Sequence, residues 1–245
     1  MKILFLITAR GGSKGVPNKN LSKIGGISLV GFKAISSRKS NHCARLIIST
    51  DSNKIQEDAR NYGVEVPFTR PTELASDTAK SGPVILHAME WIEAEGRERY
   101  DAVMLLEPSS PFARAEDYDA AIELMLKHEA QAVVGIRPTE VASTVIGPID
   151  ADGRLTKVID KLHAAREQAG QRQSLGQEYT MNGALYLFRW EYFKKHQWIY
   201  HDRDHVYGYV MDRFHSVEID EPVDLAWAEF LVAGGYVPLE PWRNS

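Results

Sequence analysis

An apolar run, Ile3 to Ile7, leads directly into a loop of residues 10–20 that is rich in glycine and basic residues. Such a run predicts a buried strand. Glycines let the backbone approach a ligand closely, and exposed N–H groups together with Arg10, Lys14 and Lys19 can neutralise a polyphosphate. The loop contains no acidic residue, although the whole chain is slightly acidic. This beginning predicts a strand of an α/β sheet followed by an anion-binding loop.

Two familiar phosphate-binding motifs are absent from the loop. It lacks both the G-x-x-x-x-G-K-[ST] pattern of a P-loop and the G-x-G-x-x-G pattern of a Rossmann dinucleotide site. A solvent-exposed turn without a ligand would also be rich in glycine, asparagine, proline and serine. The residues of the loop alone therefore leave an anion site and a plain turn open.

Length and composition indicate one globular domain, residues 1–245. With 245 residues, of which 44% are hydrophobic, the chain can bury the core of a single α/β domain. The net charge of −4 argues against nucleic acid or a membrane surface as a partner. The lone Cys43 cannot form an internal disulfide, which fits a reducing compartment. No segment approaches a membrane span, so we expect a soluble, cytoplasmic protein.

Short apolar runs alternate with helical patterns, which is typical of a mostly parallel central sheet flanked by helices. Strands are expected at 3–7, 45–50, 64–66, 102–106, 132–136, 184–188 and 216–220, with an edge strand at 206–210. Helices are expected at 27–37, after Asp51 as far as residue 62, and at 82–95, 116–128 and 222–231. Asp51 is expected to cap the helix that follows it.

The pattern changes near Pro138. Asp150-Ala151-Asp152-Gly153 predicts a turn, and residues 160–180 are polar without clear periodicity. A long segment of this kind inside a compact chain is more often functional than disordered. We therefore interpret 139–181 as an inserted arm or flap and not as part of the sheet core.

The expected strand ends carry the polar residues that suit a site. Ligands of open parallel sheets bind beyond the carboxyl ends of the strands, where the loop 10–20, Asp51 and residues 107–110 are all expected. Glu218 and Asp220 are two residues apart on an expected strand, so both would face one side. Two such carboxylates suit Mg²⁺, although a solvated strand face near a helix start would look the same.

Six motifs in this order resemble the acylneuraminate cytidylyltransferases, the CMP-sialic acid synthetases. The resemblance extends from residue 1 to about residue 232. The motifs are Ala9-Arg10-Gly11-Gly12-Ser13-Lys14-Gly15 with Lys19-Asn20, Ser49-Thr50-Asp51, Arg70-Pro71-x-Glu73-Leu74-Ala75-x-Asp77-Thr78-Ala79, Pro108-x-Ser110-Pro111, Asn182-Gly183-Ala184-x-Tyr186 and Ser216-Val217-Glu218-Ile219-Asp220.

The resemblance implies a nucleotidyltransferase with a glycosyltransferase-A-like α/β fold. Such an enzyme transfers CMP from CTP to the anomeric hydroxyl of a sialic-acid-like nonulosonic acid and releases pyrophosphate. Reactions of this kind depend mainly on positioning and charge neutralisation. The resemblance further implies Mg²⁺ as cofactor and a homodimer, with 139–181 as the dimerisation segment.

A role for each site residue also follows from the resemblance. The residues expected to be catalytic are Arg10, Lys19 and Asp220. Those expected to bind the nucleotide are Ala9, Arg10, Gly12, Ser13, Lys14, Asn20, Arg70, Ala79 and Ser81. Those expected to bind the acceptor sugar are Glu107, Ser109, Ser110, Arg172, Asn182 and Tyr186. The metal would be held by Glu218 and Asp220.

Three positions depart from the family pattern. Glu107 stands where these enzymes typically have Gln, Thr180 replaces a frequent Arg, and Glu218 replaces the first Asp of the metal pair. An ionised carboxylate at position 107 accepts hydrogen bonds but donates none. We therefore expect a sialic-acid-like acceptor other than plain N-acetylneuraminate. The alternatives are a CMP-Kdo synthetase, another sugar nucleotidyltransferase, or a nucleotide-binding regulator without catalysis.

Overall fold

The computed structural model describes residues 1–12, 15–76, 78–96, 98–169 and 177–243. In this part of the chain the central sheet has six strands in the order β4-β1-β5-β7-β6-β8. The strands are β1 (Ile3–Thr8), β4 (Cys43–Ser49), β5 (Ala102–Leu106), β6 (Ala132–Pro138), β7 (Tyr179–Arg189) and β8 (Val206–Val210). β1 is parallel to β4 and β5, and β6 to β8, whereas β7 is antiparallel to β5. The expected mostly parallel sheet and its edge strand are confirmed.

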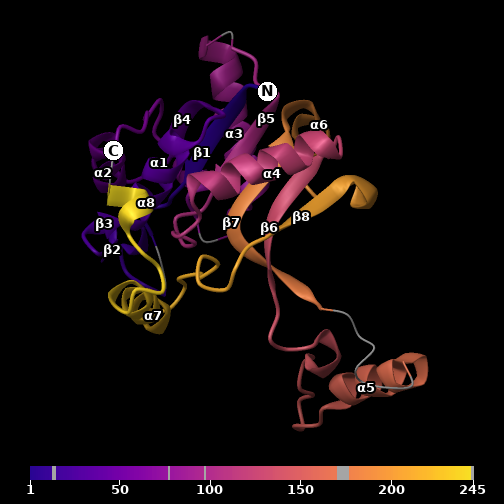
Figure 1. The fold of residues 1–245 in the computed structure, drawn as a ribbon. Coiled ribbons are helices and arrows are strands. Elements are labelled where there is room, and N and C mark those ends of the chain that lie inside the picture. The colour runs from indigo at the N-terminus through magenta and orange to yellow at the C-terminus, as the bar shows by residue number, and fades with distance from the viewer. Residues whose placement is uncertain (13–14, 77, 97, 170–176, 244–245) are drawn as a thin grey trace. The chain divides into compact units, whose positions relative to one another are not determined.

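Helices cover both faces of this sheet (Figure 1). On one face lie α1 (Leu29–Lys39), α2 (Asn53–Asn61) and α4 (Ala115–Lys127), and on the other α3 (Ser81–Gly96) and α6 (Trp190–His196). The apolar run of β1 serves both layers, because successive side chains of a strand point to opposite faces. Phe5 and Ile7 join the first cluster, whereas Leu4 and Leu6 join the second. A strand buried on both faces therefore needs an uninterrupted apolar sequence.

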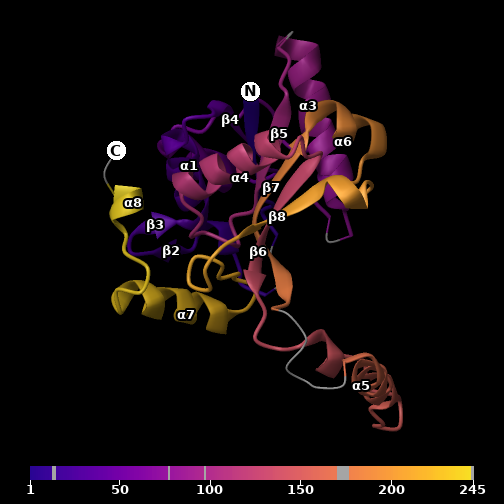
Figure 2. The ribbon, with the colours of Figure 1, turned by 45° about the vertical axis from the view of Figure 1, so that its right-hand side comes forward.

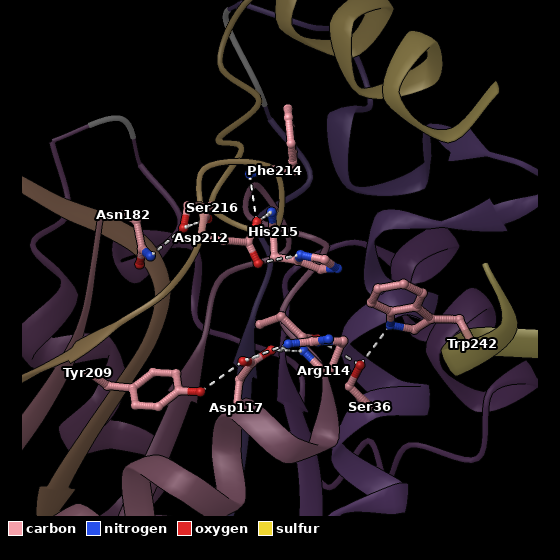
Figure 3. A network of polar contacts seen from close by, with 11 residues as sticks. Ser36, Arg114, Asp117, Asn182, Tyr209, Asp212, Phe214, His215, Ser216 and Trp242 are labelled. Atoms are coloured by element: carbon pink, nitrogen blue, oxygen red, sulfur yellow. Dashed lines mark hydrogen bonds and ion pairs between the residues drawn. The ribbon is translucent and has the colours of Figure 1, made fainter. Parts of the chain in front are cut away.

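A third apolar cluster attaches the C-terminal part of the chain to α1. It includes the hairpin of β2 (Lys23–Ile24) and β3 (Ile27–Ser28), and the helices α7 (Pro222–Ala233) and α8 (Glu240–Arg243) (Figure 2). Trp242 is 2% exposed and packs edge-on against Phe32 at a centroid distance of 5.2 Å. Its indole N–H donates to Ser36 Oγ at 2.7 Å (Figure 3). This cluster packs the middle and end of α7 against the hairpin, α1 and α8.

Two expected strands are not regular strands. Residues 216–220 form no strand, although Val217 and Ile219 are buried while Glu218 and Asp220 are exposed. The alternation in the sequence therefore reflects burial of one side, and the backbone N–H of Ile219 bonds to the Ser109 carbonyl at 2.8 Å. Residues 64–66 contribute only a single bridge, between Glu65 and Ile47.

Residues 137–181 form a compact unit of their own, Arg137–Met181, and the rest of the chain forms the other unit. These bounds lie close to those of the expected arm, 139–181. The unit contains η3 (Ser143–Val145) and α5 (Thr156–Ala169), so the expectation of an irregular segment at 160–180 is wrong for the part that α5 covers. The expected turn is present, because Gly153 has φ 85° and its N–H bonds to the Asp150 carbonyl at 2.9 Å. Dimerisation through this unit stays a prediction.

The remaining short elements of the described chain are η1 (Lys19–Leu21), η2 (Thr72–Leu74) and η5 (Arg203–His205). None of the helices in the described ranges has both the length and the apolar character that crossing a membrane requires.

Replacing Trp242 by Ala should destabilise the protein by about 3–5 kcal/mol, because it empties a packed aromatic site and removes a partner of Ser36. Urea denaturation followed by circular dichroism measures this loss. The control is Trp227→Ala on α7, where the side chain is 45% exposed and the expected cost is below about 1 kcal/mol. Equal losses in the two variants would contradict the anchoring role of Trp242.

Candidate functional site

A cavity of about 300 Å³ lies at the carboxyl ends of β1 and β5. It is lined by the loop after β1, the loop after β5, and the segment that leads into α3. The predicted site residues on its wall are Arg10, Gly12, Lys19, Asn20, Arg70, Ala79, Ser81, Glu107 and Ser109. Ser13, Lys14 and Arg172 lie outside the described residues. The fold therefore brings three distant motifs to one cavity, as the topology of strand ends predicts.

The glycine-rich loop is held by hydrogen bonds to its neighbours. Ala9, which is 1% exposed, donates its backbone N–H to the Ser49 carbonyl at 3.1 Å. The N–H of Gly11 bonds to Asp51 Oδ1 at 2.8 Å, and the Asn20 side chain donates to the Arg10 carbonyl at 2.9 Å. Asp51 therefore fixes the loop, and the expectation that its side chain caps α2 is wrong. The N-cap of α2 is Ser52, which makes no side-chain cap bond.

Lys19 joins the basic loop to the carboxylate segment near the C-terminus. Its Nζ donates to the Ile219 carbonyl at 2.7 Å and to Asp220 Oδ1 at 2.9 Å. The Lys19 side chain is 16% exposed and that of Asp220 is 66% exposed, so this ion pair opens to solvent on one side. The two backbones also approach closely, because a Cβ atom at Gly15 would lie only 2.0 Å from the Asp220 carbonyl oxygen. Only glycine fits at that position.

Arg70 lines the cavity, but much of its hydrogen-bonding capacity is used within the protein. Its guanidinium donates to both the hydroxyl and the carbonyl of Ser49, and its backbone N–H donates to the Thr50 carbonyl at 2.8 Å. Burial lowers the pKa of Arg70 to about 10, and the Asp51 carboxylate opposes this shift. Arg70 thus ties the end of β4 to the segment that carries Ala79 and Ser81.

The wall at the end of β5 carries negative charge. Burial is the main cause that raises the pKa of Glu107, and repulsion from Glu218 and Asp220 adds to it. Lys33 and Lys19 oppose the increase by attraction. Burial, followed by repulsion from the Glu107 carboxylate, raises the pKa of Tyr186 on β7. This end of the cavity therefore collects carboxylates that a cation or hydrogen-bond donors would stabilise.

Asn182, Gly183 and Ser110 form the contact between β7 and the carboxylate wall. Ser110 Oγ donates to the Asn182 carbonyl at 3.0 Å. The Asn182 amide donates to Ser216 Oγ at 3.0 Å, and that hydroxyl donates to the Asp212 carbonyl (Figure 3). Gly183 has φ 64°, and a Cβ atom there would lie 2.9 Å from both Ser110 Oγ and Glu218 Oε1. Asn182 is 1% exposed and Ser110 is fully buried, so both support the site from behind the cavity wall.

Glu218 and Asp220 could take part in holding a metal ion, because both offer carboxylate oxygens, the ligands that Mg²⁺ prefers. Within the described residues, no three His, Cys, Asp or Glu side chains are grouped so that they could hold a metal by themselves. A metal at this place would therefore complete its coordination with other oxygen ligands, such as water, backbone carbonyls or a bound ligand.

Four further residues of the cavity lining carry no functional signal of their own in the sequence, namely Thr8, Ser76, Val84 and Leu105. Ser76 accepts a hydrogen bond from the Arg10 guanidinium on its backbone carbonyl at 3.3 Å. Its place within the motif of residues 70–79 is the only signal that the sequence offers. The apolar lining residues look like ordinary core residues in the sequence.

Comparison with known proteins places this geometry in a family. The chain matches the family described as Cytidylyltransferase over residues 4–234. It is 30% identical to the post-translational flagellin modification protein B of Campylobacter coli, over 94% of this chain and 95% of that protein. It is 28% identical to the CMP-N,N'-diacetyllegionaminic acid synthase of Legionella pneumophila, covering 95% and 97%. The N-acylneuraminate cytidylyltransferase of Escherichia coli O18:K1:H7 is 31% identical over 93% of this chain and 51% of its own length.

Solved structures share the fold at low sequence identity. A CMP:2-keto-3-deoxy-manno-octonic acid synthetase, solved in complex with CTP, superimposes with a TM-score of 0.68 at 13% identity. The superposition covers 96% of this chain and all of that one. The family match and the curated relatives confirm the resemblance inferred from the six motifs. The chain belongs to the cytidylyltransferase family.

Proposed function

We propose that this cytidylyltransferase transfers CMP from CTP to the anomeric hydroxyl of a nonulosonic acid. The observation that carries the proposal is the cavity itself, which is lined by the basic residues Arg10, Lys19 and Arg70 and by the carboxylate of Glu107. Lys19 also bonds to Asp220, which lies outside the lining. In the reaction, the acceptor hydroxyl attacks the α-phosphorus of CTP and forms the new P–O bond. The bond to the β-phosphate oxygen breaks, and pyrophosphate leaves.

The residues of the cavity suit separate steps of this transfer. Arg10 and the backbone of the glycine-rich loop would hold the triphosphate, and Lys19 would stabilise the charge that develops on the leaving pyrophosphate. Ala79 and Ser81 lie along the wall on which we place the cytidine. Glu107 and Ser109 would contact the acceptor sugar. Ser13, Lys14 and Arg172 keep the roles that the family resemblance implies for them.

For the acceptor we infer an N,N'-diacetyllegionaminate-type sugar acid. Two relatives, from Legionella pneumophila and Campylobacter jejuni, are each named as CMP-N,N'-diacetyllegionaminic acid synthases and are 28% identical to this chain. The carboxylate of Glu107 supports an acceptor other than plain N-acetylneuraminate, because it cannot donate a hydrogen bond as a glutamine amide would.

Mg²⁺ is the cofactor that we propose, held by Glu218 and Asp220. When bound, the ion would neutralise phosphate charge and polarise the phosphoryl group. Asp220 lies beside Lys19 and is exposed on its other side, so it can reach a ligand without a change of fold. Either carboxylate could accept the proton from the acceptor hydroxyl as the P–O bond forms.

We further propose a homodimer in which residues 137–181 meet the partner. This unit exposes apolar side chains, namely Val145, Ile146, Ile149, Leu155, Ile159 and Leu162. Exposed apolar residues gathered on a small unit favour an interface with another protein surface. A cytoplasmic location, expected from the lone Cys43, also stays a prediction.

The proposed function is tested by pyrophosphate release in the presence of Mg²⁺. Each of the four NTPs is combined with N,N'-diacetyllegionaminate, N-acetylneuraminate, pseudaminate and Kdo. We expect release with CTP, and the highest kcat/KM with N,N'-diacetyllegionaminate. Release with Kdo alone would indicate a CMP-Kdo synthetase. CTP binding without turnover of any acceptor would favour a non-catalytic nucleotide binder.

Replacing Lys19 by Ala should lower kcat by roughly 10²- to 10³-fold, as expected when a preorganised group that stabilises developing charge is removed. Steady-state pyrophosphate release measures the change, and circular dichroism checks the fold. The matched control is Lys23→Ala, an exposed lysine that follows in the same segment. Normal turnover by the Lys19 variant would remove its assignment to the leaving group.

Asp220→Asn should lower activity and raise the Mg²⁺ concentration that gives half-maximal rate, because an amide oxygen binds Mg²⁺ more weakly than a carboxylate. A Mg²⁺ titration at saturating CTP measures both effects. Glu229→Gln, an exposed substitution on α7, is the control and should leave the titration unchanged. An unaltered Mg²⁺ requirement in the Asp220 variant would contradict the metal role.

Gly183→Ala should reduce kcat by roughly tenfold to a hundredfold, because the new methyl group must displace Glu218 or Ser110. The control is Gly235→Ala, where φ is also positive, 74°, but nothing lies within 4 Å of the added Cβ atom. Both variants should lose similar stability from backbone strain, about 1 kcal/mol. Unfolding curves and pyrophosphate release separate the two effects, and equal activity would contradict the positioning role of Gly183.

A further inference from the structure

Lys33 is a buried lysine that none of the steps above uses. It lies on α1 with 0% exposure, and its Nζ donates to the Ala184 carbonyl at 2.8 Å. The only other contact of the ammonium that the described residues give is the Tyr118 ring, with its centroid at 5.9 Å. No described carboxylate lies within 4.0 Å of it in an ion pair. A buried ammonium with a single neutral acceptor is unfavourable unless a negative charge lies near.

Of the two carboxylates that attract Lys33, only Glu107 has no other polar partner among the described side chains. Its ammonium is attracted by Glu107 and Asp117, in that order. Asp117 already pairs with Arg114 at 3.2 Å and accepts a hydrogen bond from the Tyr209 hydroxyl at 3.0 Å (Figure 3). The Glu107 carboxylate has no such partner among the described residues. Among the surrounding charges, Glu107 is therefore the strongest that stabilises the charged form of Lys33, and Lys33 the strongest that stabilises the charged form of Glu107.

The electrostatic effects on the two groups are mutual. Burial lowers the pKa of Lys33 to about 7, and Glu107 is the strongest of the charges that oppose this change. Burial and repulsion from Glu218 raise the pKa of Glu107, and Lys33 is the strongest of the charges that oppose that change. Attraction between oppositely charged groups stabilises the charged form of each.

The hydrogen bond of Lys33 also connects it to the residues around Gly183, at the acceptor end of the cavity. Ala184 follows Gly183 directly, and Gly183 lies against Ser110 and Glu218. The backbone N–H of Ser110 in turn bonds to the Glu107 carbonyl at 3.1 Å. Lys33 thus bonds to the Ala184 carbonyl beside the acceptor end of the cavity, and its charge attracts the Glu107 carboxylate at the same end.

We infer that Lys33 is a positioning residue for the acceptor end of the cavity, because its ammonium balances the Glu107 carboxylate and holds the Ala184 carbonyl. This pair allows a carboxylate at position 107, so the wall accepts hydrogen bonds from the sugar. An acceptor that presents N–H or O–H donors to this wall fits it better than one that presents a carbonyl oxygen. The acceptor assignment rests on the proposed function, whereas the charge pair does not.

A double-mutant cycle tests the pair through thermal stability. The proteins are the wild type, Lys33→Met, Glu107→Gln and the double variant. Each single substitution leaves one buried charge without its partner and should lower Tm, by roughly 10 °C for Lys33→Met. The double variant should recover most of that loss, because neither charge remains. Lys39→Met is the control, since this exposed lysine lies on the same helix and should shift Tm by no more than about 2 °C.

The direction of the Tm change in Glu107→Gln shows whether Glu107 is paired with Lys33. If Glu107 were not paired with Lys33, removing its charge would relieve the repulsion from Glu218 and raise Tm. An increase in Tm, or additive losses in the cycle, would overturn the inference. This comparison holds even if Lys33→Met does not fold.

Kinetics test the positioning role separately. Pyrophosphate release is measured with N,N'-diacetyllegionaminate and CTP, each varied in turn. Lys33→Met should raise the KM of the acceptor by roughly tenfold or more and leave the KM of CTP within about twofold. Equal increases in both KM values would contradict a role at the acceptor end. If the wild type turns over no acceptor, the proposed function fails, while the Tm cycle still decides the pair.

Discussion

The contact of Lys19 with Ile219 and Asp220 is the interaction on which the site depends. It joins Lys19 to residues that are 200 and 201 positions further along the chain. The contact holds the basic loop against the segment that carries Glu218 and Asp220. The close approach at Gly15 and the buried Val217 and Ile219 fix that segment without a strand pairing. This contact places the Asp220 carboxylate beside a basic residue that lines the cavity.

Charge balance explains how the site can be both buried and reactive. The Lys19–Asp220 pair satisfies both groups before a ligand arrives, and one side of it remains open to solvent. In the proposed reaction, the triphosphate would bind Lys19 in place of Asp220, and Asp220 would be available to hold Mg²⁺. Lys33 would balance the charge of Glu107 in a similar way. A site arranged in this way meets its substrates with charges already in place, which is the main requirement of phosphoryl-type transfer.

Much of this arrangement could be predicted from the sequence, because it depends on local patterns. Uninterrupted apolar runs revealed the buried strands, and the order of strands and helices placed the loop 10–20 and Glu107 at one edge. The expectations that failed depend on tertiary contacts. Residues 216–220 alternate as a strand would but have no strand to pair with, and Asp51 binds Gly11 in preference to a helix end. The burial of Lys33 leaves no local signal, because α1 is buried around most of its circumference and its sequence therefore marks no single core-facing side.

One cavity at the strand ends is proposed to hold both the nucleotide and the acceptor. A crystal structure of the protein with CTP and Mg²⁺ would test this proposal. We expect the triphosphate on the backbone of residues 10–12 and on Lys19, with the cytosine beside Ala79 and Ser81 and the α-phosphate facing Glu107. A nucleotide bound at another surface, with the Lys19–Asp220 pair undisturbed, would contradict the proposal.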